Sequence, residues 1–152
     1  MKIDMKKTKD NKSLGYAIAR TNWYLKTLLN KVLNEEGFNI TNEQWVVLKV
    51  IQEFPAASQT KIAEHSQKDK TNITRILDLL EKSGFIERRR DQRDRRMNRI
   101  YITRQGEKKL KAIHPMTRRI NEVCTRSLNK EQEKELLKSL DAVCKAIGDE
   151  LH

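Results

Sequence analysis

The sequence predicts a mainly α-helical protein with one small β-hairpin, and three observations support this prediction. Apolar residues recur at helical spacing over most of the 152 residues. One stretch departs from that spacing: Ile86, Ile100 and Ile102 flank an arginine-rich segment with the period of two that is typical of strands. Gly84 stands directly before this stretch, and glycine commonly follows the last turn of a helix.

Two helices are expected before the first proline. In residues 14–32, apolar side chains recur at spacings of three, four and seven, and the pattern stops near Gly37. Residues 1 to about 12 are rich in lysine and lack this periodicity, so we expect them to form a frayed arm. The second helix opens with the capping-box sequence at residues 41–44 and ends before Pro55.

The next segment predicts a helix-turn-helix. Ser58 is placed to cap a short helix that buries Ile62. Asp69 is placed to cap a longer helix that closes at Gly84. A short polar turn separates the two helices, which is the arrangement of the helix-turn-helix motif.

Two long helices are expected after the hairpin. The first is capped by Thr103 and contains Pro115, which should kink it or mark its first turn. The second opens with the capping-box sequence at residues 129–132 and carries an apolar stripe to Leu151. These stripes have no large core of their own to cover. We therefore expect the terminal helices to pack against those of a second copy of the chain, as a homodimer.

The element order is that of a winged helix-turn-helix with long N- and C-terminal dimerisation helices. We expect a single domain over residues 1–152, because the length is typical of one domain. Within it, about residues 41–103 form the winged DNA-binding part. About residues 13–36 and 104–152 form the dimerisation helices.

The composition favours a polyanionic partner. Lysine and arginine number 32 against 21 acidic residues, a formal net charge of +11. No apolar run approaches the roughly 18 residues that a membrane span needs, and the polar start has no signal-peptide core, so we expect a cytoplasmic protein with no membrane partner. Cys124 and Cys144 lie on apolar stripes, where we expect them to be buried small hydrophobic residues.

The hairpin carries seven arginines between positions 88 and 99, which we expect to project from its exposed face and tip towards a nucleic acid. Arg93 and Arg95, nearest the tip, are the candidates for a minor groove. A structural role is expected for three residues that can pair across the turn, Asp91, Asp94 and Arg96. Phosphate or scaffold roles are expected for the first three arginines of the run, Arg88, Arg89 and Arg90.

The second helix of the motif has a buried face made by its apolar positions, Ile73, Ile76, Leu77 and Leu80. Its polar residues then lie towards solvent or a DNA groove, namely Lys70, Thr71, Asn72, Thr74, Arg75 and Asp78. Arg75 can pair with guanine and Asn72 with adenine. Thr71 and Thr74 can offer methyl groups to thymine or hydroxyls to phosphate. The start of the preceding helix is placed to hold a phosphate through Ser58, Gln59, Thr60 and Lys61.

Residues 69–108 resemble the central part of the multiple-antibiotic-resistance-regulator (MarR) family of bacterial transcription factors. The landmarks are a recognition helix that ends in Leu-Glu-Lys-x-Gly and a wing that carries DxRDxR, matched here by Asp91, Arg93, Asp94 and Arg96. The element order agrees with the family over roughly residues 13–151. The resemblance implies a two-fold dimer, binding of double-stranded DNA through recognition helix and wing, and usually repression that a small ligand or an oxidant relieves.

The resemblance also implies a cleft for a small aromatic or phenolic effector between the dimerisation and DNA-binding parts. The candidates to line it are Tyr16, Trp23, Trp45 and Met116. Packing between helices is the favoured interpretation of the same residues. Some relatives sense peroxide through a cysteine near the N-terminus, but residues 1–123 contain none. The three histidines have no partner at helical metal-ligand spacing, so we expect neither a cofactor nor a metal.

An enzyme is not expected, because the sequence has no glycine-rich phosphate loop, no nucleophile elbow and no spaced pair of histidine and carboxylate. The predicted function is a sequence-specific DNA-binding regulator. The alternative is a basic protein that binds or packages nucleic acid without specificity. Hydrogen-bonding residues on the recognition helix favour the regulator, because a purely electrostatic binder needs only lysine and arginine there.

Overall fold

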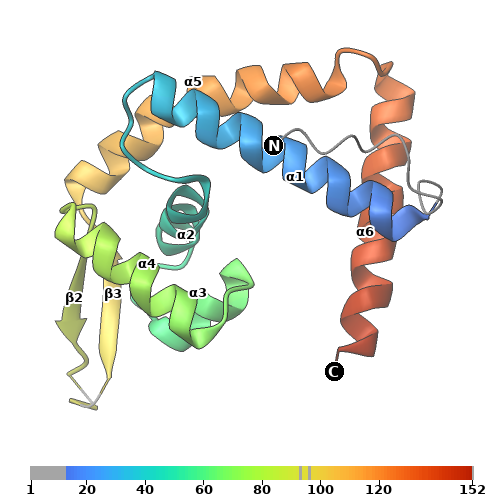
Figure 1. The fold of residues 1–152 in the computed structure, drawn as a ribbon. Helices are drawn as coiled ribbons and strands as arrows, with labels where there is room; N and C mark the ends of the chain where they lie inside the picture. Colours follow the sequence, from blue (N-terminus) through green and yellow to red (C-terminus); the bar gives the residue numbers. More distant parts are fainter. Residues whose placement is uncertain (1–12, 93, 96, 152) are drawn as a thin grey trace. The chain divides into compact units, whose positions relative to one another are not determined.

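The computed structural model describes residues 13–92, 94–95 and 97–151, and within them it has six α-helices and a three-stranded sheet (Figure 1). The helices are α1 (Leu14–Glu35), α2 (Asn42–Glu53), α3 (Gln59–Ser66), α4 (Lys70–Lys82), α5 (Arg104–Thr125) and α6 (Lys130–Glu150). The strands are β1 (Ala57–Ser58), β2 (Ile86–Arg90) and β3 (Asn98–Ile102). The predicted fold class is confirmed. The chain divides into two compact units, one up to Pro115 and one from Met116.

Side-chain caps start the helices of the first unit where the sequence predicts them. Thr41 accepts the backbone N–H of Gln44 at 3.2 Å, and the Gln44 side chain accepts the Thr41 N–H at 2.9 Å, which completes the capping box of α2. Ser58 caps α3 and Asp69 caps α4, and each side chain accepts one backbone N–H from the residue three positions later. Gly84 follows α4 with a φ of 72°, a left-handed conformation that glycine adopts without strain.

The sheet is antiparallel with the order β1-β3-β2. The hairpin places Ile86 opposite Ile102, and Arg88 opposite Ile100. On the other edge of β3, Ala57 pairs with Ile100. The sequence did not predict β1, because two residues are too short to show a period. This strand ends at the residue that caps α3, so it ties the start of the helix-turn-helix to the wing.

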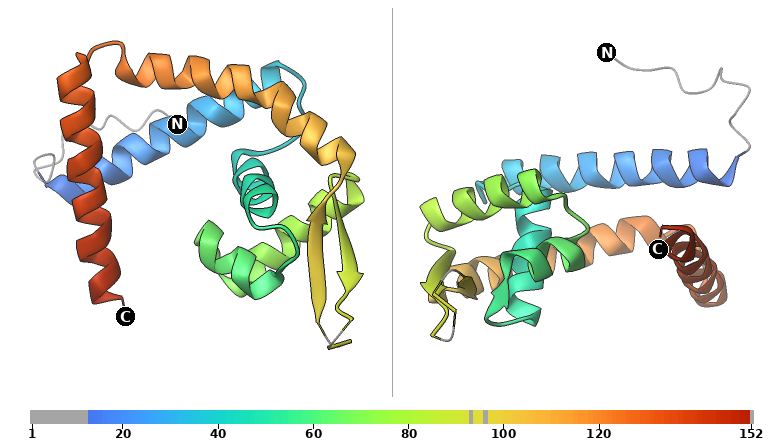
Figure 2. Two further views of the ribbon diagram at one scale, coloured as in Figure 1. Left: turned by 180° about the vertical axis from the view of Figure 1, so that it is seen from behind. Right: turned by 90° about the horizontal axis from the view of Figure 1, so that it is seen from below.

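The core of the first unit forms where α2, α3 and α4 pack against one another, and the strands of the hairpin extend from this cluster (Figure 2). The four apolar residues predicted to bury one face of α4 are at most 1% exposed. From the other elements, the fully buried side chains are Leu33, Val47, Leu48, Ile51, Ile62, Ile100 and Ile113. This apolar cluster holds α4 rigidly by one side, so its opposite side stays free for contacts.

The turn after α4 is bound to the start of α5. The Thr103 hydroxyl donates to the Gly84 carbonyl at 2.6 Å and accepts the Gly106 N–H at 3.1 Å. The Phe85 carbonyl lies so close to Gly106 that a Cβ there would stand 2.2 Å from its oxygen. Gly106 is therefore required by close packing of two backbones, a role that the sequence analysis did not assign.

In the second unit, α5 continues beyond Pro115 and α6 follows after a short turn. The predicted capping box of Asn129 and Gln132 is confirmed. The expected burial of Cys124 and Cys144 is wrong for this chain by itself, because both are exposed free thiols. Cys124 lies near the end of α5, and Cys144 lies on α6, which buries none of its residues. Its apolar stripe is exposed at Leu136, Leu137, Leu140, Ile147 and Leu151. In the part of the chain that the structure describes, no helix has the length and hydrophobicity that a membrane span requires.

Candidate nucleic-acid interface

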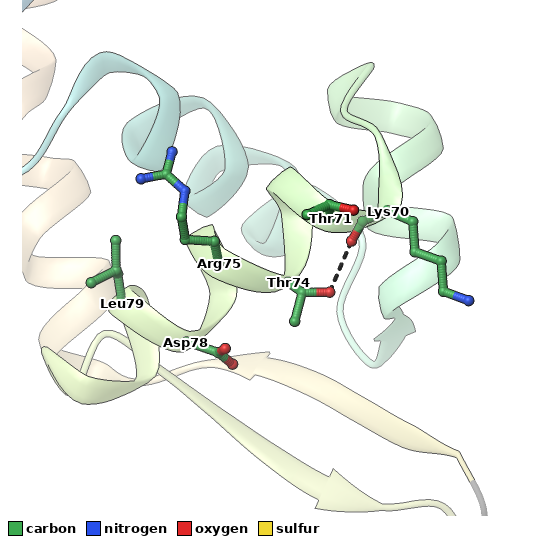
Figure 3. Close-up of a pocket in the computed structure, with 6 residues that line it drawn as sticks. All are labelled: Lys70, Thr71, Thr74, Arg75, Asp78 and Leu79. Atoms are coloured by element: carbon green, nitrogen blue, oxygen red, sulfur yellow. Dashed lines mark hydrogen bonds between the residues drawn. The ribbon is translucent and has the colours of Figure 1, made fainter.

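The outer side of α4 carries the polar residues that the sequence assigns to DNA. A hollow of about 560 Å³ lies along it and is lined by Lys70, Thr71, Thr74, Arg75, Asp78 and Leu79 (Figure 3). All six are exposed, whereas Asn72 is half-buried at the edge of this side. We call these seven residues the outer face of α4. The face offers cations, hydroxyls, methyl groups, an amide and one carboxylate, which is a set suited to mixed polar and apolar readout.

The start of α3 lies beside the second turn of α4. The Gln59 side-chain amide donates to the Thr74 hydroxyl at 2.6 Å. That hydroxyl in turn donates to the backbone carbonyl of Lys70 at 2.8 Å. The Ser58 hydroxyl accepts the N–H of Lys61 at 3.3 Å as the cap of α3. Of the candidates on these two helices, the structure thus brings Gln59 and Thr74 together at one edge of the outer face, while Ser58 caps α3.

Arg75 reaches back along α4 towards its first turn. One guanidinium nitrogen donates to the Asn72 side-chain oxygen at 3.4 Å. On α2, Glu43 accepts a hydrogen bond from the Lys68 ammonium at 2.9 Å. This hydrogen bond lowers the pKa of Glu43 below its ordinary value. Partial burial acts in the opposite direction, and the positive charges of Lys68, Lys26 and Arg75 make smaller contributions that also lower the pKa. The Lys68 contact ties α2 to the turn between α3 and α4.

Arg88 joins the wing to α4. Its guanidinium donates to Glu81 at 2.5 Å and to Asp78 at 2.6 Å, and its backbone N–H donates to the second Glu81 oxygen at 3.2 Å. The expectation that the arginines project outward is wrong for Arg88, whose side chain is 19% exposed. The period of two puts it on the same face of the hairpin as Ile86 and Ile100, and that face packs against α4.

An ion pair that the sequence analysis did not identify lies where the two strands of the wing meet its tip. Arg99 donates to Asp91 at 2.5 Å and to the Ala56 carbonyl at 3.3 Å, so it links the hairpin to the loop before β1. Asp91 also accepts the backbone N–H of Asp94 at 3.0 Å. In the strand register Arg99 lies opposite Arg89, and Asp91 follows the last residue of β2, so the pair is not a directly opposite cross-strand pair that a residue pattern could indicate.

The remaining wing arginines have different surroundings. Arg89 pairs with Glu87 and lies 4.7 Å from the ring centre of Tyr101, an arrangement that supports the strands. Arg90 and Arg95 are exposed. Two of the candidates, Arg93 and Arg96, lie outside the described residues.

The four candidates for an effector cleft are divided between the two units. Tyr16 and Trp23 lie on α1 and Trp45 on α2, whereas Met116 belongs to the second unit. Trp23 is 56% exposed and meets Tyr24 edge to face at 5.0 Å, so the interpretation as core packing is wrong for Trp23 in this chain. Among the described residues, no group of three or more histidine, cysteine, aspartate or glutamate side chains is placed to hold a metal ion.

Comparisons with known proteins identify the family. A profile of the MarR family matches residues 40–97. The HTH-type transcriptional regulator BilQ of Clostridium symbiosum is 30% identical over 113 residues, which cover 74% of this chain and 77% of BilQ. The chain belongs to the MarR family. The transcriptional repressor MprA of Escherichia coli K12 is 34% identical to this MarR-family chain over 86 residues, which cover 57% of the chain and 49% of MprA.

A solved structure agrees with this membership. A mutant of Escherichia coli MarR complexed with operator DNA superimposes with a TM-score of 0.79 at 25% identity, over 86% of this chain and 92% of that one. By name, BilQ is a transcriptional regulator and MprA is a transcriptional repressor. The protein is therefore a transcriptional regulator of the MarR family with a winged helix-turn-helix.

Proposed function

We propose that this MarR-family regulator binds a specific double-stranded DNA site as a homodimer and represses transcription until a small effector releases it. The observation that carries the proposal is the outer face of α4, which is mostly exposed and mostly polar, while the opposite side of the helix is buried in the core. A helix held by one side and polar on the other fits a major groove. Specific binding needs such hydrogen-bonding groups in addition to charge.

Each part of the interface receives a role in this proposal. Arg75 reads guanine and Asn72 reads adenine, because bidentate pairing suits these side chains. Contacts to the DNA from the rest of the helix-turn-helix involve Ser58, Gln59, Lys70, Thr71 and Thr74. In the wing, Arg93 and Arg95 enter the flanking minor groove. The shape of the wing is maintained by Asp91, Asp94 and Arg96.

The homodimer is supported by the exposed apolar side chains of the terminal helices. Leu14 and Trp23 on α1 are 61% and 56% exposed, and Ile147 on α6 is 55% exposed. Apolar stripes of this length are unusual on the surface of a monomer. We therefore assign the regions of about residues 13–36 and 104–152 to dimerisation.

The repressor role is supported by the likeness to MprA, which is a repressor. For the effector we propose a small aromatic or phenolic compound, bound near Tyr16, Trp23 and Trp45 of the first unit. Exposed aromatic side chains such as Trp23 favour a ligand that can stack on a ring. We propose that the protein acts in the cytoplasm and has no catalytic activity.

The experiment that tests this function is a selection of bound duplexes from a randomised DNA library at physiological salt. Two recognition helices related by a two-fold axis enter successive major grooves, so we expect an inverted repeat with half-sites centred about 10 base pairs apart. Flanks rich in A·T pairs are expected where the wings meet the minor groove. Enrichment of no inverted repeat would overturn the proposal.

The Arg75→Ala variant gives the selection its control. Loss of a guanine-reading side chain should cost about 1–3 kcal/mol at one base pair of each half-site and relax the preference there. The rest of the motif should stay unchanged. An unchanged preference at every position would remove Arg75 from the base-reading residues.

A further inference from the structure

The hydroxyl of Thr74 has two hydrogen-bond partners in the structure, the Lys70 carbonyl at 2.8 Å and the Gln59 side-chain nitrogen at 2.6 Å. A hydroxyl has one proton to donate, and a backbone carbonyl can only accept. The Thr74 proton is therefore given to Lys70. Gln59 must then be the donor in the second contact, which also fixes the orientation of its amide.

This arrangement decides between two ways in which Thr74 can meet DNA. A phosphate oxygen at neutral pH can only accept a hydrogen bond, and the Thr74 hydroxyl has no second proton to offer. The methyl group is the other branch of the side chain. Figure 3 shows that this methyl carbon points away from the Lys70 carbonyl, while the oxygen points towards it. Thr74 thus presents its methyl group, not its hydroxyl proton, on the outer face of α4.

We propose that Thr74 is a specificity-determining residue that recognises the 5-methyl group of a thymine through its own methyl group. The inference rests on the proposed function, because it requires the outer face of α4 to lie in a major groove. In that groove thymine is the base that presents a methyl group, and a threonine methyl is a suitable apolar partner for it. The site would therefore favour thymine over cytosine at one position of each half-site.

The contact has a small, measurable effect. Burial of one methyl group contributes about 0.8 kcal/mol, which corresponds to a change of about fourfold in affinity. Uracil differs from thymine only in the missing methyl group. A thymine-to-uracil replacement therefore isolates this contact without disturbing base pairing or the phosphates.

The experiment measures binding by fluorescence anisotropy to the duplex recovered from the selection. Each thymine is replaced by uracil in turn, at the equivalent position of both half-sites. For the wild-type protein, we expect one thymine whose replacement weakens binding about fourfold per half-site. Thr74→Val keeps the methyl group and loses the hydroxyl, so the discrimination should remain. Thr74→Ser keeps the hydroxyl and loses the methyl group, so the discrimination at that position should vanish.

Thr71→Ser is the matched control, because it makes the same change one turn earlier on the same helix. It should leave the discrimination at the Thr74 position unchanged. Equal thermal unfolding midpoints for the three variants exclude a change in folding. The inference is overturned if Thr74→Ser still discriminates at every position, or if Thr74→Val abolishes the discrimination. Failure of the selection to return any motif is a different result, which would overturn the proposed function itself.

Discussion

Arg88 of the wing and Asp78 of α4 form an ion pair in which the guanidinium nitrogen lies 2.6 Å from the carboxylate oxygen. The same guanidinium also binds Glu81, one turn further along the helix. Asp78 lines the outer face of α4, where an unpaired carboxylate would repel DNA phosphates. Arg88 therefore does two things at once: it fixes the wing to the recognition helix and neutralises an acidic group at the interface.

The first prediction is that Arg88→Met destabilises the protein more than Arg89→Met does. Both changes remove one positive charge, but Arg88 is mostly buried between two carboxylates and Arg89 is exposed. We expect the free energy of unfolding in urea to fall by about 1–2 kcal/mol for Arg88→Met, since both carboxylates remain partly exposed to screening solvent. Arg88→Lys should retain only part of the stability that Arg88→Met loses, because an ammonium group cannot bind two carboxylates in the forked geometry of a guanidinium. Equal urea midpoints for the two methionine variants would contradict this account.

A second prediction concerns Gly106, where helix propensity and packing give opposite signs. Alanine favours helices over glycine, so propensity alone predicts that Gly106→Ala stabilises α5. Packing predicts the reverse, because the new Cβ would meet the Phe85 carbonyl oxygen at 2.2 Å and an Ile102 side-chain carbon at 2.8 Å. We expect a loss of about 1–3 kcal/mol by thermal or urea unfolding.

Gly15→Ala is the control for this prediction. Gly15 also lies in a helix of the first unit, and a Cβ there would have no atom within 4 Å. The substitution should be neutral or stabilise the protein by up to about 1 kcal/mol. If Gly106→Ala were as stable as Gly15→Ala, the close approach of the two backbones would be absent.

The third prediction is a pH dependence that arises from Glu43. The hydrogen bond from Lys68 lowers the pKa of this carboxyl in the folded protein. A lowered carboxyl pKa contributes stability at pH values above the ordinary value of 4.5 and loses it as the pH falls through the lowered pKa. The difference in urea stability between wild type and Glu43→Gln should therefore be largest near neutral pH and shrink below about 4.5.

Lys68→Met provides an independent check on the cause. This variant keeps the Glu43 carboxyl but removes its hydrogen-bond donor. The fall in urea stability that the hydrogen bond causes below about pH 4.5 should therefore be absent from it. A wild-type advantage that persists unchanged to acidic pH would show that the hydrogen bond does not shift the titration.

The fourth prediction tests the dimer. Leu140 and Ile147 are exposed on α6, so the double change to glutamate should leave the folded chain intact while it abolishes association. Binding of the selected duplex should be lost together with the dimer. Ser139→Glu adds a negative charge at a polar, exposed position of the same helix and should leave the dimer unchanged. A well-folded wild-type monomer by light scattering at micromolar concentration would rule out the dimer.

The local features of the fold were predictable because they depend on short spacings. Thr41, Ser58, Asp69 and Asn129 each cap a helix as the sequence indicates, and each needs a partner only three residues away. The buried side of α4 follows equally from its period. Non-local contacts were not predictable in this way. The approach of Gly106 to Phe85 and the pairing of Ala57 with Ile100 join segments whose meeting depends on the whole fold.

In the candidate site, too, local features were predictable from the sequence and non-local contacts were not. The sequence was sufficient to assign the polar side of α4, but not to say which hydroxyl or guanidinium is already bound by the protein. The Gln59 amide meets Thr74 across 15 positions of the chain, and Arg88 meets Asp78 across 10. These contacts distinguish candidates that the sequence alone left equivalent. Arg88 supports the interface, and Thr74 presents its methyl group.

The measurement that tests the central claim most directly compares affinities at physiological salt. The selected duplex, a duplex of the same composition in shuffled order and a single-stranded RNA are titrated with the wild-type protein. Sequence-specific recognition predicts that the selected duplex binds at least about a thousandfold more tightly than the shuffled one, with the RNA weaker still. Equal affinities for the three nucleic acids would contradict the account and would identify the chain as a general basic nucleic-acid-binding protein.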